Sequence, residues 1–160
     1  MTIYMQCDGI NGDVTNDQHK NWIQLNSVQF HLESPVYTKV GDTSDRVKGR
    51  PVIGEIEILK PTDSSSIHLM NALLNGTLIS TVKIDVCHTG NGLKPHEQYV
   101  LSNVLVSGFS ELQSAHFSKP LEMLRLNFTK IERTHTKYAE DGSAVSPNRV
   151  GYDLTQAKSC

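Results

Sequence analysis

Cysteine and histidine side chains that could hold a metal ion gather at one point of the sequence. Cys87 and His88 are followed shortly by His96, with Thr-Gly-Asn-Gly at residues 89–92 between them. Zinc sites use short, regular spacings of cysteine and histidine, and this trio lacks such a spacing. Because the intervening residues are those of a hairpin turn, the commoner interpretation is a solvated hairpin tip. We expect no metal ion here.

Residue types of a hydrolase occur as well, but without a supporting motif. Ser110, His116 and Asp153 could form a nucleophilic triad, yet any serine-rich chain offers such combinations and no Gly-x-Ser-x-Gly elbow is present. Glu55 and Glu57 share a strand face as catalytic carboxylates can, although charges there also protect an exposed strand edge from aggregation. The chain has neither a phosphate-binding glycine loop nor a dinucleotide fingerprint. We predict a protein that is not an enzyme and has no cofactor.

The composition of the 160 residues predicts one globular domain over residues 1–160. A formal charge of −2 and scattered basic residues give no reason to expect nucleic acid or an anionic membrane as partner. No apolar run approaches the ~20 residues that cross a bilayer, so membrane insertion is not expected. Residues 1–8 lack the features of a secretory signal. Three widely spaced cysteines are typical of reduced thiols in a protein that folds in the cytoplasm.

Alternating apolar and polar residues indicate strands along most of the chain. In one such segment, four side chains alternate against Met123, Arg125 and Asn127; they are Glu122, Leu124, Leu126 and Phe128. Similar alternation occurs at residues 2–7, 52–58, 78–86 and 99–112, with turn residues between the segments. Many strands with regular turns predict a mainly β protein, either a sandwich or a small barrel.

A single helix is predicted after residue 63. Asp63 and Ser64 can cap its first turn, and Gly76 suits a left-handed end. Three apolar residues follow at helical spacing: Ile67, Met70 and Leu74. A helix of about ten residues needs packing to be stable, so we expect these three side chains to face the sheets.

The segment 33–50 has no such pattern and is predicted to be a long loop. Its apolar residues are sparse: Val36, Tyr37, Val40 and Val47. They cannot build a core, but they are suited to contact a neighbouring subunit, with Tyr37 as the strongest candidate. The alternative is a mobile surface loop without a partner.

The order of several segments carries a resemblance over nearly the whole chain. These segments are Asp-Gly-Ile-Asn-Gly-Asp at 8–13, His-Lys at 19–20, Trp-Ile-Gln-Leu at 22–25, Lys-Pro-Thr-Asp-Ser-Ser-Ser at 60–66, residues 99–107, residues 122–138 and Gly-Tyr-Asp-Leu at 151–154. Together they resemble the Hcp family, the tube protein of type VI secretion systems. Ile67 stands where many members have proline, Pro61 stands where a polar residue is common, and residues 33–50 do not align.

The resemblance implies a small β-barrel of two packed antiparallel sheets, with one α-helix at its side and a long extended loop. It further implies hexameric rings that stack into a hollow tube, with the spike protein, the sheath and small effectors as further partners. The protein would be cytoplasmic before firing and then secreted to the extracellular space or a target cell without a signal peptide. Two alternatives remain at this point: a tail-tube subunit of a contractile phage-like particle, and a secreted β-sandwich binding module.

Overall fold

The computed structural model describes residues 1–41 and 46–160, and strands make up most of this part of the chain. The elements are β1 (Thr2–Cys7), β2 (Ile23–Leu25), β3 (Ser27–Gln29), β4 (Leu32–Glu33), β5 (Val36–Thr38), β6 (Arg46–Lys48), β7 (Val52–Ile53), β8 (Ile56–Pro61), α1 (Ser65–Asn75), β9 (Ile79–Cys87), a 3-10 turn (Thr89–Asn91), β10 (Pro95–Leu112), β11 (Leu121–Asn127), β12 (Lys130–Tyr138), β13 (Ala144–Asp153) and β14 (Lys158–Ser159). The predicted mainly β class is confirmed. No helix of the described residues has the length and apolar character needed to cross a membrane.

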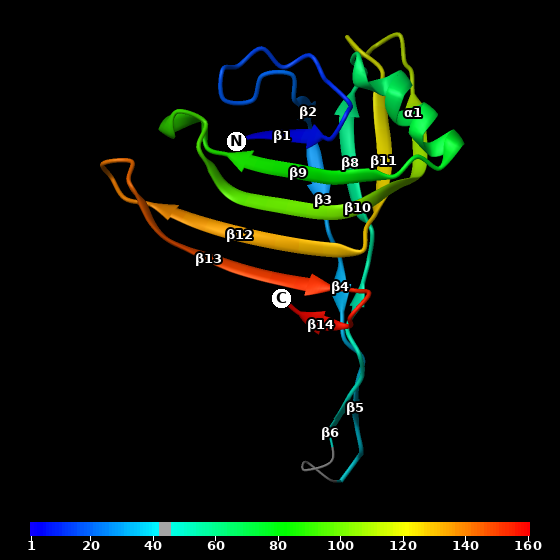
Figure 1. Ribbon diagram of the computed structural model, residues 1–160, viewed down its shortest axis with the longest axis vertical. Coiled ribbons are helices and arrows are strands. Elements are labelled where there is room, and N and C mark those ends of the chain that lie inside the picture. Colours follow the sequence, from blue (N-terminus) through cyan, green and yellow to red (C-terminus); the bar gives the residue numbers. More distant parts are fainter. Residues whose placement is uncertain (42–45) are drawn as a thin grey trace.

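Strand β10 belongs to two antiparallel sheets. Its first half pairs with β9 and β12, and its second half pairs with β11. The first sheet continues through β1 and β2 on one side and through β13 and β14 on the other, while the second continues through β8 and β3. Figure 1 shows the strands of the two sheets crossing at a steep angle. The prediction of packed antiparallel sheets is confirmed, although the barrel is not closed, because β2, β3 and β14 each pair on one side only.

One hydrophobic core lies between the two sheets. Strand β8 alternates buried and half-buried residues, and β11 does the same with buried and exposed ones. The core members come from both sheets and from the helix, and include Met5, Ile58, Leu69, Leu101 and Leu124. The alternation predicted for the strands is therefore confirmed, and it sets which side chains are removed from water.

Two irregular positions allow β10 to pass from one sheet to the other. Asn103 has a left-handed backbone with a φ of 53°, a conformation that asparagine tolerates better than most residues. The pairing with β11 then shifts between Val106 and Gly108, as at a β-bulge. Such irregularities bend a strand and increase its twist. They explain how a strand of 18 residues can serve two sheets of different direction.

The segment predicted as a loop is a narrow hairpin. Strands β4 and β7 pair near the body, and β5 and β6 pair farther out. Figure 1 shows this hairpin, here called the arm (residues 32–53), extending from the body along the longest axis of the molecule. The long extended loop predicted here is present and contains two short strand pairs. The alternating pattern is missing from β5 and β6 because neither face of this outer strand pair packs on a core.

Helix α1 lies at the end of the molecule opposite the arm (Figure 1). It packs through Ser65, Ser66, Leu69 and Ala72, with Leu73 half-buried. The prediction that three other side chains face the sheets was wrong, because Ile67, Met70 and Leu74 point outward and are 73%, 45% and 69% exposed. The helix carries apolar residues on both sides, and Leu69, with no exposed area, is the one that enters the core.

This orientation of the helix predicts unequal effects of two alanine substitutions. Leu69→Ala is expected to lower the free energy of unfolding by ~2–5 kcal/mol, since it leaves a cavity in the core. Leu74→Ala should change it by less than ~0.5 kcal/mol, as exposed substitutions usually do. Urea denaturation at low protein concentration, where contacts between copies add least, measures both values. A larger loss for Leu74→Ala would mean that the helix docks through the other face.

Candidate functional site

The apolar residues of the arm are exposed to solvent. Tyr37 is 71% exposed and pairs across the arm with Val47. Val36 and Val47 are each more than half exposed, and Val40 is fully exposed. These are the four residues predicted for a subunit interface, and the structure places them together on one projecting element. Large apolar side chains gathered in this way mark surfaces that contact another molecule.

The base of the arm is fixed by close backbone contacts. The Gly49 amide donates to the Pro35 carbonyl at 2.8 Å, and the Gly54 amide donates to the His31 carbonyl at 2.9 Å. A Cβ atom at Gly49 would lie 2.7 Å from Pro35 Cγ, so a larger residue would push the two sides of the arm apart. The arm therefore leaves the body in a defined direction.

A hydrophobic cavity of about 390 Å³ lies where the arm joins the body. Phe30, Leu32 and Ile53 line it from the arm side, and Val150 and Tyr152 line it from β13. Leu32 and Val150 are more than half exposed. No sequence pattern points to this cavity, because its two walls are about a hundred residues apart in the chain.

The first turn of α1 is capped by Asp63 rather than by Ser64. Asp63 Oδ1 accepts a hydrogen bond from the Ser65 amide at 3.0 Å, and Ser66 Oγ accepts one from the Asp63 amide at 3.0 Å. The second bond is one half of a capping box, whereas the Asp63 carboxylate accepts from the amide two residues on and not three. Ser64 occupies the N-cap position as predicted, but its own side chain makes no cap hydrogen bond. At the other end, Gly76 is left-handed as predicted, with a φ of 59°.

Beneath the helix start lies a buried ionic cluster. Lys60 and Glu122 are fully buried and face each other across β8 and β11, with 2.8 Å between Nζ and Oε2. Lys60 Nζ also lies 2.9 Å from Asp63 Oδ1 and 3.0 Å from Ser66 Oγ. The cluster ties two strands to the helix cap. A sequence signal existed, since the alternation places Glu122 in phase with Leu124 and Lys60 in phase with Ile58.

A second buried polar cluster fixes the connection between β1 and β2. His19 Nε2 lies 3.1 Å from Asp85 Oδ2, and the His19 ring stacks on Tyr4 with 4.4 Å between centroids. Gln98 Nε2 donates to Asp85 Oδ1 at 2.8 Å. Cys87 Sγ is 4.0 Å from His19 Nε2, but burial, and then the charge of Asp85, raise the pKa of this thiol to about 11. Such a thiol is protonated at neutral pH and is a poor nucleophile.

The residues considered for metal binding do not converge. The rings of His88 and His96 stack with 3.9 Å between centroids, and burial, followed by His88, lowers the pKa of His96. Cys87 is fully buried, and its Sγ lies 4.0 Å from His19 Nε2. Within residues 1–41 and 46–160, no group of three or more histidine, cysteine or carboxylate side chains is placed to hold a metal ion.

The proposed triad residues are also not brought together. Asp153 accepts hydrogen bonds from Thr155, and the His116 amide donates to Ser114 Oγ. Ser110 lies within β10, opposite Met123 of β11. No hydrogen bond in the described part of the chain joins Ser110, His116 and Asp153.

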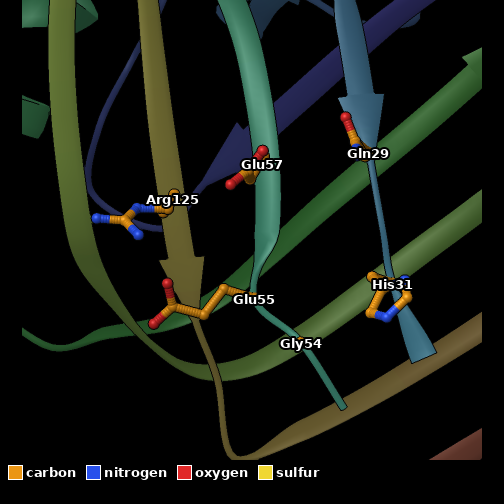
Figure 2. A pocket seen from close by; sticks show the side chains of 6 residues that line it. All are labelled: Gln29, His31, Gly54, Glu55, Glu57 and Arg125. Atoms are coloured by element: carbon orange, nitrogen blue, oxygen red, sulfur yellow. The ribbon is translucent and has the colours of Figure 1, made fainter. Parts of the chain in front are cut away.

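Glu55 and Glu57 lie in a shallow polar pocket on the outer face of the second sheet. Figure 2 shows Gln29 and His31 on one side of these carboxylates and Arg125 on the other. Glu55 Oε1 accepts a hydrogen bond from Asn127 Nδ2 at 3.0 Å. The pocket offers hydrogen-bonding groups to a polar solute, while the two carboxylates face open space rather than an enclosed reaction site.

Comparisons with known proteins agree on one family. A family model described as "Type VI secretion system effector, Hcp" matches residues 4–135. A comparison with curated protein sequences gives no match.

Solved structures show the same fold at low sequence identity. A structure described as that of a type six secretion system protein is 19% identical, covers 99% of each chain and has a TM-score of 0.93. Hcp1 from Salmonella typhimurium is 19% identical over 99% of this chain and 98% of its own, with a TM-score of 0.79. A type VI secretion system effector from Yersinia pestis is 18% identical over 94% and 98%, with a TM-score of 0.72. Since the family model spans most of the sequence, the chain belongs to the Hcp family of type VI secretion system proteins.

Proposed function

We propose that this protein is the tube subunit of a type VI secretion system. Six copies form a ring, and rings stack into a hollow tube that is expelled from the cell. The observation that carries this proposal is the arm, whose four large apolar side chains lie uncovered in the single chain. Contact with other copies in the assembled ring would cover these apolar side chains, which explains why they are exposed in the single chain.

The proposed role is structural rather than catalytic. Burial, and then the charge of Asp8, raise the pKa of the Cys7 thiol to about 12, and that of Cys87 is about 11, so both buried thiols stay protonated at neutral pH. The buried ionic groups of Lys60 and Glu122 bind each other and are sealed from solvent. These groups stabilise the fold and are inaccessible to a substrate.

The remaining parts of the proposal rest on family membership. The matching model describes a type VI secretion system effector, a protein that leaves the cell. We infer that the chain is made in the cytoplasm and is exported with the tube, without a signal peptide. Small effectors carried in the lumen, the spike protein and the surrounding sheath are its further proposed partners.

The mass of the purified protein in solution tests the proposal. Light scattering coupled to size exclusion should give six times the 17.8-kDa mass of the chain. Negative-stain electron microscopy of the same fraction should show rings with a central hole. The mass of a single chain at micromolar concentration would contradict the proposal.

A further inference from the structure

The turn between β9 and β10 carries a pair of stacked histidines. The rings of His88 and His96 lie nearly parallel, with 3.9 Å between centroids and 18° between planes. His88 directly follows β9 and is exposed, whereas His96 is partly buried within β10. Stacking is favourable for two neutral rings, but two charged rings at this distance repel each other. The pair therefore disfavours the state in which both rings carry a proton.

An irregularity in the strand pairing brings the two rings together. The register between β10 and β9 shifts between Pro95 and Glu97, as at a β-bulge. His96 is the residue between them, and the extra residue of a bulge has its side chain turned out of the regular alternation. This turn directs the His96 ring onto His88. The stack therefore depends on the local backbone geometry of the turn.

One ring nitrogen of His96 is in a position that suits only the neutral ring. Its Nδ1 atom is buried, and no residue of the described part of the chain forms a hydrogen bond with it. In a neutral imidazole one nitrogen carries no proton, while in a charged ring both nitrogens are donors. A buried donor without an acceptor is costly. Burial, and then the charge of His88, accordingly lower the pKa of His96.

The other charged groups around His96 do not reverse this effect. Behind burial and His88, the nearby Glu97 carboxylate raises the pKa of His96, while His135 on β12 and the amino group of Met1 lower it. Glu97 is already bound to Arg133 Nε and His135 Nδ1, each at 2.7 Å. The carboxylate that favours a charged His96 is thus shared with two other basic side chains.

The same turn is attached to the turn between β12 and β13. Lys94 Nζ donates to the Gly142 carbonyl at 3.0 Å and lies 5.8 Å from the centre of the Tyr138 ring. The Tyr138 hydroxyl donates to the Pro95 carbonyl at 2.9 Å. Figure 1 shows both turns at the same end of the first sheet. Since Lys94 and Pro95 directly precede His96, a movement of His96 strains these contacts.

We propose that the stacked pair of His88 and His96 is an acid-sensitive switch of the β9–β10 turn. While His96 is neutral, the rings stack and the turn stays attached to the β12–β13 turn. A proton on His96 separates the rings, and the β9–β10 turn opens. The switch lies within one chain, so it does not depend on the proposed assembly of copies into rings.

The direction of the pH effect follows from the two states of the turn. In the open turn the His96 ring is in water and has the ordinary pKa of 6.5, whereas the closed turn lowers this pKa. A proton therefore binds more tightly to the open form. The opening equilibrium gains up to about a tenfold factor for each pH unit below 6.5. The gain ends at the pKa of the closed form, below which both forms are protonated.

Hydrogen exchange of the amides of residues 86–98 tests the switch at about pH 7.5 and about pH 5.5. After correction for the intrinsic dependence of exchange on pH, opening in the unmodified protein should be roughly fivefold or more higher at the lower pH. His96→Phe keeps a ring that can stack on His88 but cannot take a proton, so its turn should stay closed at both pH values. Should His96→Phe misfold by circular dichroism, His96→Gln is the second variant without a titrating ring, and its opening should also be equal at both.

A matched control removes a histidine elsewhere. His116 is exposed in the turn before β11, and His116→Gln should keep the full response of the unmodified protein. Nuclear magnetic resonance of the ring Cε1–H groups adds a direct measurement. The pKa of His96 should be lower in the folded protein than in the same protein unfolded in urea.

Three results would overturn the inference. The first is a change in opening of less than about twofold between the two pH values in the unmodified protein. The second is the same response in the variants of His96 as in the unmodified protein, because another group would then carry the effect. The third is a His96 ring that takes up its proton at the same pH in the folded and the unfolded chain.

Discussion

Replacing Lys60 with methionine is expected to lower the free energy of unfolding by about 3–5 kcal/mol. The side chain of Lys60 is fully buried and its ammonium group lies within 3 Å of Glu122 and Asp63 carboxylate oxygens. Without the ammonium group, the fully buried Glu122 carboxylate has no opposite charge nearby and cannot reach water. Urea denaturation followed by circular dichroism measures this loss.

The double variant Lys60→Met/Glu122→Met should recover most of that stability. Replacing both partners of a buried ion pair with apolar residues is often neutral or stabilising, because the cost of burying two charges is removed with them. Asp63 keeps some solvent exposure, so it can remain charged in the double variant. If the double variant were as unstable as Lys60→Met, the loss would come from packing of the lysine stem and not from the uncompensated charge.

A partly exposed ion pair provides the matched control. Lys130 and Glu132 lie 2.7 Å apart on β12, and the Lys130 side chain is 34% exposed. Lys130→Met should lower the free energy of unfolding by less than about 1 kcal/mol, since water replaces the lost partner. Equal losses for Lys60→Met and Lys130→Met would contradict the role of burial in this argument.

If the chain forms the proposed ring, shortening the arm is expected to convert that ring into monomers. Replacing residues 38–44 with Asn-Gly removes Val40 and shortens the segment between β5 and β6, and it leaves the inner β4–β7 pairing in place. The body should stay folded, because no residue of the arm's outer half belongs to the hydrophobic core. Light scattering should show the mass of one chain. The circular dichroism spectrum should keep the shape of the unmodified protein's spectrum, and thermal unfolding should remain a cooperative transition.

The control for this deletion changes polar residues of the arm and keeps its length. Thr38→Ala/Lys39→Ala preserves the four apolar side chains and removes one cation, so the oligomer should persist with a weaker dependence on salt than before. An intact ring after the deletion would show that the arm is dispensable and that copies meet through the strands.

The position of the helix was predictable from the sequence, but its orientation was not. Asp63 and Gly76 mark its ends correctly, because capping depends on local backbone geometry. Two apolar stripes compete for the core: one contains Ile67, Met70 and Leu74, and the other contains Leu69, Ala72 and Leu73. Periodicity measures how apolar a stripe is and not whether the core of its own chain or a neighbouring molecule covers it. The prediction therefore assigned the stripe of Ile67, Met70 and Leu74 to the core, although this stripe faces outward.

The strands of the arm and the buried ionic cluster were not predicted from the sequence, for different reasons. Alternation in a sequence arises when one strand face is buried, and the arm has no buried face in the single chain. Lys60 follows the alternation of Ile56 and Ile58, but a lysine in a core position is rare enough that its phase alone is weak evidence. Only the pairing of β8 with β11 puts an opposite charge directly across from it, and that pairing joins residues far apart in the sequence.

Strand β10 has a consequence for how the chain can fold during synthesis. It holds β9, β11 and β12 in place, yet it follows the first 94 residues of the chain. Until the ribosome has released β10 and then β11, the edges of β9 and β8 that these strands pair with are free, and the apolar faces that later meet across the core are exposed to water. Domains built from such distant pairings fold slowly, and their exposed strand edges aggregate at high concentration. The first half of the nascent chain therefore needs protection from aggregation until β10 and β11 have emerged.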